Sequence, residues 1–313
     1  MAAGLTGLGV DAGGTKTAVV VMAADGRVLG RGQGGPANPR FVSEAEARRS
    51  IREAVRKALG DAGCRAGDVD RAVTGGPAGE GLLRAVLAAE LPGVPVRHVG
   101  EAALALAAGG IVGAGGAVVA GTGSLAAARR ATGDWVIVGG WGTVMGDEGS
   151  AYAIGRAALR AVARAADGRG RATGLTARMQ AWAGVGQTRA VIDRVYDPAT
   201  SRRDIAALAR EVDEEARAGD PVARSILTQA GRALAGQIAT ALRRAGLTHE
   251  PVPVSAVGGV LLASDRVLSA MVEALGRRCP SASVFRARRS LAEAAAWWAA
   301  GGGVDHDGGP VSW

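Results

Sequence analysis

The chain has 313 residues, 48 % of them hydrophobic and 21 % charged, so it is long enough for two folded lobes and too apolar for a disordered protein. Its net charge of +8 raises the question of nucleic acid. Of its 37 basic residues only Lys16 and Lys57 are lysines, and the arginines are interspersed with acidic residues along helical segments. Aromatic residues make up 3 %, too few for a base-stacking platform, so we expect no nucleic-acid partner.

Cysteine and histidine usage argues against a metal or redox centre. Cys64 and Cys279 are too few for a metal cluster or a disulfide framework, which fits a reducing cytoplasm, and the three histidines lack the spacing of metal ligands. The uncharged stretch 102–128 is long enough to cross a membrane, but its glycines at 113–116 divide it into a helix end, a turn and a core strand. No signal-peptide pattern opens the chain. We expect a cytoplasmic protein without a membrane segment.

The first half is predicted to begin with three strands, 5–10, 17–22 and 28–31, joined by the glycine-rich turn 11–15 and the tight turn Asp25-Gly26. A helix is predicted over 44–62, because Ser43 and Glu46 have capping-box spacing and apolar residues recur on one face. The pattern then predicts a strand at 71–74, a helix near 81–91, a strand at 94–99 and a helix from Glu101.

The opening pattern recurs in the second half. Strand, small-residue turn, strand, tight turn and strand occupy 117–138, as a duplicated α/β lobe would. Helices are predicted near 150–166, 206–218, 221–245 and 265–277, with short strands at 254–257 and 283–286. We assign 1–112 to an N-terminal lobe, 113–300 to a C-terminal lobe and 301–313 to a frayed glycine-rich tail.

The first glycine-rich turn is the strongest candidate for a phosphate site. Its glycines resemble a dinucleotide fingerprint or a phosphate-binding loop. In both motifs a helix follows the glycines, whereas residues 17–22 are strand-like here, so neither interpretation fits. The remaining interpretation is a hairpin turn that binds phosphate. Its backbone N–H groups would approach the phosphate, and Thr15 and Lys16 would add further hydrogen-bond donors. Asp11 beside the phosphates implies Mg²⁺ between carboxylate and anion. An ordinary Asp-Gly-Gly hairpin turn is the alternative.

Two later turns are weaker candidates. The segment Gly121-Thr122-Gly123-Ser124 is a second small-residue hairpin that could hold the β- and γ-phosphates. Gly258 and Gly259 follow a predicted strand and precede a helix, so they could let adenosine approach the backbone, although glycine at such a turn often serves packing alone.

This arrangement resembles the superfamily of actin, hexokinase and the heat-shock ATPases, and within it the BadF/BadG-type ATPases and N-acetylglucosamine kinases. The resemblance covers nearly the whole chain and implies an α/β fold of two actin-like (ribonuclease H-like) lobes, each a mixed sheet with helices, with a cleft between them. Its most specific stretch, 139–152, looks like the segment of those kinases that helps to form the sugar site. By that likeness Gly140, Trp141 and Asp147 contact sugar, as does Asn38. A glycine-rich loop with a helix cap is the structural alternative.

Similar kinases carry a catalytic carboxylate just after the strand that ends here at Val99, which implies that Glu101 is the base and a sugar contact. The family shows an aspartate there, and an asparagine where this chain has Leu125. The loss of that amide, with Glu101, Asp147 and Glu148 retained, favours glucosamine narrowly over N-acetylglucosamine. The sequence has no cysteine cluster, which argues against the zinc-containing hexokinase-like relatives and the iron–sulfur dehydratase activators.

The sequence therefore predicts a cytoplasmic, ATP- and Mg²⁺-dependent amino-sugar kinase that phosphorylates the acceptor at its 6-hydroxyl. Catalysis would rest on Glu101 and on Asp11, the metal ligand. Rival interpretations are an ATPase that drives a partner protein, a kinase for another hexose and a non-catalytic sugar sensor. A homodimer is left open. ATP contacts are expected from Gly13, Gly14, Thr15, Lys16, Gly121, Thr122, Gly123, Ser124, Gly258 and Gly259.

Overall fold

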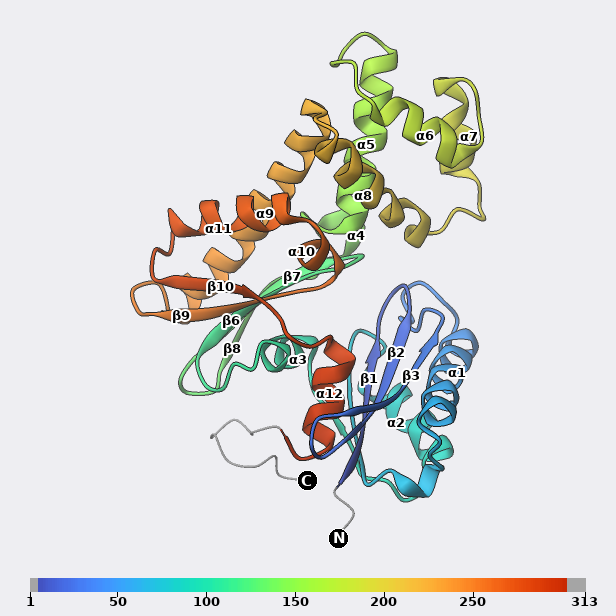
Figure 1. Cartoon of the computed structure of the whole chain (residues 1–313), viewed down its shortest axis with the longest axis vertical. Helices are drawn as coiled ribbons and strands as arrows, with labels where there is room; N and C mark the ends of the chain where they lie inside the picture. Colours follow the sequence, from blue (N-terminus) through green and yellow to red (C-terminus); the bar gives the residue numbers. More distant parts are fainter. Residues whose placement is uncertain (1–4, 303–313) are drawn as a thin grey trace. The chain divides into compact units, whose positions relative to one another are not determined.

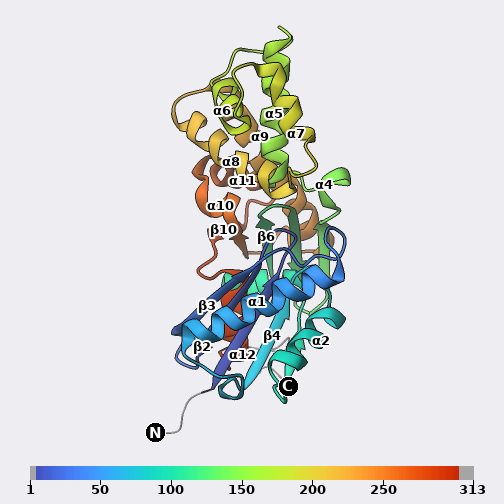
Figure 2. The same ribbon diagram turned by 90° about the vertical axis from the view of Figure 1, so that its right-hand side faces the viewer.

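The structure is a computed structural model that describes residues 5–302, and it divides into two compact units. The first unit holds the chain up to Gly115, the turn Arg129–Asp134 and the segment from Ala287 onward. The second holds Gly116–Ala128 and Trp135–Arg286. Each unit is built on one five-stranded sheet. Figures 1 and 2 show the ribbon of the whole chain in two views.

The sheet of the first unit has the order β3-β2-β1-β4-β5. The hairpin strands β1 (Thr6–Ala12), β2 (Thr17–Ala23) and β3 (Val28–Gly34) are antiparallel to one another. The strands β4 (Arg71–Gly75) and β5 (Val96–His98) run parallel to β1, in a register that pairs Asp11 with Gly75. The carboxyl ends of β1, β4 and β5 therefore lie at the same edge of the sheet.

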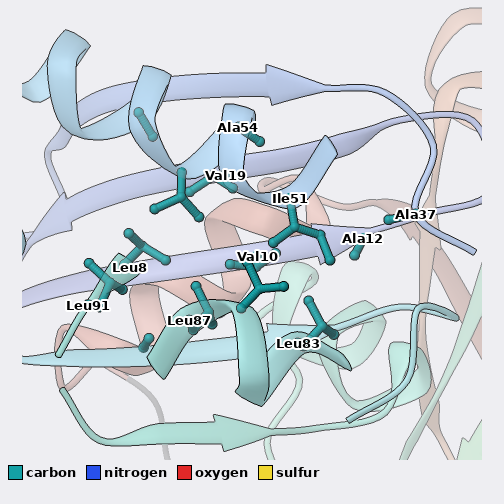
Figure 3. Packing of buried hydrophobic residues seen from close by; sticks show 14 of the residues in the cluster. Leu8, Val10, Ala12, Val19, Ala37, Ile51, Ala54, Leu83, Leu87 and Leu91 are labelled. Carbon is teal, nitrogen blue, oxygen red and sulfur yellow. The ribbon is translucent and has the colours of Figure 1, made fainter. Parts of the chain in front are cut away.

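One face of this sheet is covered by α1 (Glu44–Ala62) and α2 (Glu80–Glu90). Leu8 and Val10 of β1 point to this face and pack with Ile51 of α1 and with Leu83 and Leu87 of α2 (Figure 3). The Ser43 hydroxyl accepts a hydrogen bond from the Glu46 N–H (3.2 Å), so the N-cap expected from the sequence is confirmed. The 3₁₀ turn Ala66–Asp68 connects α1 to β4.

The opposite face is covered by α12 (Leu291–Ala299) and α3 (Glu101–Ala108). A Cβ atom at Gly9 would lie 2.1 Å from the Ala296 backbone nitrogen in α12, and one at Gly7 would lie 2.2 Å from that of Ala300, the C-cap of α12. The glycines that imitate a dinucleotide fingerprint therefore let a helix approach β1 closely. The sequence grouped 113–300 as one lobe, whereas α12 packs on the first sheet. Residues 303–313 of the expected frayed tail lie outside the described part of the chain.

The sheet of the second unit repeats this plan in the order β10-β9-β6-β7-β8. The strands β6 (Gly115–Ala120), β7 (Ser124–Arg129) and β8 (Trp135–Gly139) are joined by turns of three and five residues, too short for parallel connections. The strand β9 (Val252–Val257) is parallel to β6 and to β10 (Ala282–Arg286). Each half thus has a hairpin triplet followed by two parallel strands, which confirms the predicted fold class.

Helices make up the rest of the second unit. The long helix α9 packs against β8, α8 and α11, and α8 packs against α5. The bounds are α4 (Gly142–Met145), α5 (Ala151–Ala166), α6 (Leu175–Ala183), α7 (Val191–Tyr196), α8 (Arg202–Arg217), α9 (Pro221–Ala245), α10 (Gly259–Ala263) and α11 (Asp265–Gly276), with a 3₁₀ turn at Thr188–Ala190. Within residues 5–302, no helix is long and apolar enough to span a membrane.

Candidate active site

The first candidate turn connects β1 to β2. The Gly13 N–H donates to the Lys16 carbonyl (2.9 Å), which closes a four-residue loop beyond the pair Ala12–Thr17. The Lys16 side chain is exposed. A Cβ atom at Gly14 would meet only side-chain atoms at 3.8–3.9 Å, so the fold itself tolerates more bulk there. Backbone N–H groups in such an open, glycine-rich loop can donate hydrogen bonds to a phosphate.

Asn38 lies against this turn although it is far along the chain. The Ala37 N–H donates to the Gly13 carbonyl (3.0 Å), and a Cβ atom at Gly14 would be 3.9 Å from the Asn38 amide nitrogen. The Asn38 side chain is buried, and its amide oxygen accepts from the Arg40 N–H (3.0 Å). One expected sugar contact and the first phosphate turn are therefore neighbours within the first unit.

Asp11 occupies the carboxyl end of β1, directly before the turn. Burial raises the pKa of its carboxyl to about 6, and attraction to Lys16 partly opposes this rise. A raised pKa means that ionisation of this group at neutral pH destabilises the free protein. A cation placed there would remove that cost. Asp11 thus has the electrostatic environment expected of a metal ligand, and phosphate oxygens and water would supply the remaining ligands of Mg²⁺.

Glu101 lies at the same edge and on the same face of the sheet. Asp11 pairs with Gly75, and a Cβ atom at Gly75 would meet the Leu104 side chain of α3 at 2.4 Å, so α3 covers this face beside Asp11. Glu101 is the first residue of α3, and the chain before it is held to β4 by the Val99 N–H on the Thr74 carbonyl (2.8 Å). Neighbouring strands lie about 4.8 Å apart, so the ends of β1 and β5 are separated by about 10 Å.

The second candidate turn connects β6 to β7 and is held by a dense set of hydrogen bonds. The Gly121 N–H donates to the Gly123 carbonyl (2.9 Å), and the Ala151 N–H at the start of α5 donates to the Gly121 carbonyl (2.9 Å). The Ser124 hydroxyl donates to the Glu148 carbonyl (2.9 Å). A Cβ atom at Gly121 would meet nothing within 4 Å, whereas one at Gly123 would lie 2.9 Å from both Asp147 carboxylate oxygens.

Asp147 is buried beneath this turn, at 4 % exposure. Its carboxylate accepts from the Ser124 N–H (3.0 Å) and lies 3.8 Å from the Arg202 guanidinium. Burial raises the pKa of Asp147, while the Ser124 N–H and Arg202 oppose that rise. Among residues 5–302 it is the sole non-glycine residue with positive φ (60°), so the backbone there is constrained. Asp147 supports the turn; its predicted contact with sugar stays a prediction.

The other predicted sugar contacts in this unit are exposed at the end of β8. Gly140 donates through its N–H to the Ser124 carbonyl (3.0 Å) and has positive φ (74°). The Trp141 side chain is 69 % exposed. The half-buried Leu125 lies beside them, because a Cβ atom at Gly140 would be 3.7 Å from the Leu125 Cβ. Leu125 and Trp141 are thus the apolar side chains of this segment.

Gly258 has a counterpart in the first unit that sequence reasoning missed. A Cβ atom at Gly258 (φ 96°) would lie 2.5 Å from the Ala120 carbonyl oxygen at the end of β6. One at Gly76 (φ 98°) would lie 2.6 Å from the Ala12 carbonyl oxygen at the end of β1. Gly76 and Gly258 therefore hold equivalent places in the two sheets. This equivalence could have been predicted from the sequence, because a predicted strand leads into a glycine pair in both halves, at Gly75-Gly76 and at Gly258-Gly259.

The geometry thus divides the predicted site residues between two duplicated sheets. Residues 11–16, Asn38 and Glu101 lie in the first unit, and residues 121–124, 140–147 and 258–259 lie in the second. Across residues 5–302, no group of three or more histidine, cysteine, aspartate or glutamate residues could hold a metal ion.

Two sheets of one topology, each with a glycine-rich hairpin turn at its edge, define the class of actin-like ATPases and sugar kinases. The chain belongs to the BadF/BadG/BcrA/BcrD ATPase family, whose model matches residues 8–296. The resemblance inferred from the sequence is confirmed.

Named relatives agree with this assignment. The chain is 28 % identical over 259 residues to the N-acetylmuramic acid/N-acetylglucosamine kinase of Clostridium acetobutylicum, covering 81 % of this chain and 85 % of that protein. It is 30 % identical over 273 residues to the N-acetyl-D-glucosamine kinase of Dictyostelium discoideum, covering 80 % and 84 %. The structure of a candidate N-acetylglucosamine kinase from Chromobacterium violaceum has a TM-score of 0.73, 24 % identity, and coverage of 94 % and 98 %. The last likeness concerns the fold.

Proposed function

We propose that this protein transfers the γ-phosphoryl group of ATP to a hexosamine, at its 6-hydroxyl. The observation that carries the proposal is the pair Asp11 and Glu101, which share one edge and one face of the first sheet beside a glycine-rich turn. The ends of β1, which carries Asp11, and of β5, which leads to Glu101, lie about 10 Å apart, which leaves room for a phosphoryl group and a hydroxyl at this edge.

In the proposed reaction the Glu101 carboxylate accepts the proton of the sugar hydroxyl. The sugar oxygen then forms a bond to the γ-phosphorus as the bond to the β-phosphate oxygen breaks, which yields ADP and the sugar phosphate. Asp11 would hold Mg²⁺, which neutralises charge on the phosphates when it is bound. Backbone N–H groups of the two hairpin turns and the Lys16 ammonium would orient the phosphates.

For the acceptor we propose N-acetylglucosamine ahead of glucosamine, which reverses the narrow preference from sequence. Both relatives described above are named for N-acetylated sugars. Asp147 faces Arg202 at 3.8 Å, so its charge is partly compensated and attracts a cationic amine less than expected. The exposed Trp141 and the half-buried Leu125 near Gly140 offer apolar surface that suits an acetyl methyl group.

Sugar-dependent release of ADP tests the proposal against its rivals. We would measure ADP formation with hexoses, hexosamines and N-acetylhexosamines, with and without Mg²⁺. A hexosamine kinase releases ADP only when an amino sugar is added. Equal ADP release without sugar would favour an ATPase that drives a partner protein, and no release under any condition would favour a sugar sensor. Cytoplasmic location and a homodimer remain predictions.

A further inference from the structure

A groove of about 440 Å³ lies in the second unit between α5 and the first turns of α9, the two helices labelled in Figure 1. Its floor is apolar, formed by alanines of α5 with Val222 and Ile226 of α9. Ser225 and Gln229 of α9 add a hydroxyl and an amide to one wall. This volume lies within the range of small-molecule sites, about 300–1,000 Å³. None of its lining residues belongs to the candidate active site.

The other wall carries four arginines. Arg156, Arg160 and Arg164 follow one another at intervals of four residues, so they form a row along one face of α5 that spans about 12 Å. Arg171 stands in the loop that follows the helix. No aspartate or glutamate is among the residues that line the groove. The groove therefore combines an apolar floor with concentrated positive charge.

These guanidinium groups are not compensated within the protein. Throughout residues 5–302, the side chains of Arg160, Arg164 and Arg171 make no hydrogen bond, ion pair or ring contact, and that of Arg156 makes one weak hydrogen bond, to the Thr143 carbonyl (3.4 Å). Elsewhere in the same unit, Arg178 contacts Glu211, Glu214 and Glu215 at 2.7–3.0 Å. Like charges in one groove repel each other, so an anion that enters relieves that repulsion and gains charge-assisted hydrogen bonds.

We propose that this arginine groove, defined by Arg156, Arg160, Arg164 and Arg171, is a second binding site that takes an organic phosphate with two or more anionic groups. The row of guanidinium groups matches phosphates spaced about 6–12 Å apart, because successive members rise about 6 Å along the helix. The apolar floor accommodates the organic body of the ligand. A sugar bisphosphate, whose two phosphates lie at opposite ends of the sugar, has this chemistry.

Binding of defined anions tests the groove. We would titrate the full-length protein at low ionic strength with tripolyphosphate, fructose 1,6-bisphosphate and, separately, inorganic phosphate, by isothermal titration calorimetry. Saturating ADP would be present to occupy the nucleotide site, and Mg²⁺ would be left out because tripolyphosphate binds it. We expect one polyanion site per chain, with affinity at least tenfold lower in the double variant Arg160→Gln/Arg164→Gln. Tighter binding of the bisphosphate than of tripolyphosphate identifies an organic phosphate as the ligand class.

Two further variants complete the design. Arg210→Gln/Arg266→Gln removes two exposed arginines from α8 and α11, outside the groove, and should leave the affinity unchanged. Gln229→Glu places a carboxylate in the groove with little change of shape and should weaken binding at least tenfold even if the arginine variant folds poorly. The proposal is overturned if no polyanion binds at millimolar concentration, if the groove and control variants bind alike, or if tripolyphosphate binds more tightly than the bisphosphate. Sugar-dependent ADP release is a separate measurement, so these outcomes do not depend on the proposed reaction.

Discussion

Replacing Asp11 by asparagine should stabilise the free protein while it removes the proposed activity. The Asp11 carboxyl has a pKa of about 6, against 3.8 for an ordinary aspartate, because burial disfavours its charged form. This difference amounts to at most about 3 kcal/mol of folding free energy lost above pH 6. Asparagine keeps the shape of the side chain and carries no charge, so it avoids that cost.

The pH dependence gives this prediction its sign. Between pH 3.8 and 6 the native state holds a proton on Asp11 that the unfolded state has released, so stability falls as the pH rises through this window and is level above it. The advantage of Asp11→Asn should therefore grow by about 2 kcal/mol between pH 4.5 and pH 7.5. In a domain of this size that corresponds to a widening of the Tm difference by about 4–8 °C.

The assay is thermal unfolding of both proteins at the two pH values, in EDTA and without nucleotide. Asp25→Asn, which removes an exposed carboxylate from the turn after β2, is the control for the change in net charge. A Tm difference between wild type and Asp11→Asn that is the same at pH 4.5 and pH 7.5 would refute the electrostatic reasoning. With Mg²⁺ and ATP present, the wild type should gain more stability than Asp11→Asn.

The remaining predictions concern the base, the second turn and the acceptor. Glu101→Gln should lower kcat by about 10² or more with little change in sugar KM; near-normal kcat in this variant, with activity lost in Asp147→Asn, would move the base to Asp147. Gly121→Ala should raise the KM for ATP about tenfold without loss of stability, because the added Cβ atom meets nothing in the protein but blocks a phosphate; Gly67→Ala, equally open, is the control, and equal KM values would contradict the phosphate role. The ratio of kcat/KM for N-acetylglucosamine to that for glucosamine should exceed one, and a ratio below one would restore the charge argument for the free amine.

Much of the local structure could be predicted because its signals are local. The helix expected at 221–245 has those bounds, with Pro221 at its first turn and Gly246 in the left-handed conformation at its C-cap. Ser150 caps α5, the helix that was predicted to begin near residue 150. The two hairpin triplets were also recognisable, since each combines short, largely apolar strands with turn residues. The short helices α6 and α7 were missed, because their segments show no strong apolar periodicity.

The rest depends on contacts between distant residues. The sequence around α12 does not indicate that this helix packs on β1, nearly 300 residues earlier. The one related signal is the pair Gly7 and Gly9 in β1, and their pattern also fits a nucleotide fingerprint. The burial of Asp147 under the second turn was equally hidden, because its partner Ser124 precedes it by 23 residues. Sequence motifs named the residues of the candidate site, whereas only the fold distinguishes those that support a turn from those open to a ligand.

Identification of the reaction product tests the central claim most directly. We would incubate the protein with ATP, Mg²⁺ and N-acetylglucosamine and follow the reaction by ³¹P and ¹³C NMR. The account predicts one sugar phosphate for each ADP, with the phosphate on the 6-hydroxyl and no free phosphate released. Inorganic phosphate formed with each ADP, while the sugar stays unmodified, would contradict it.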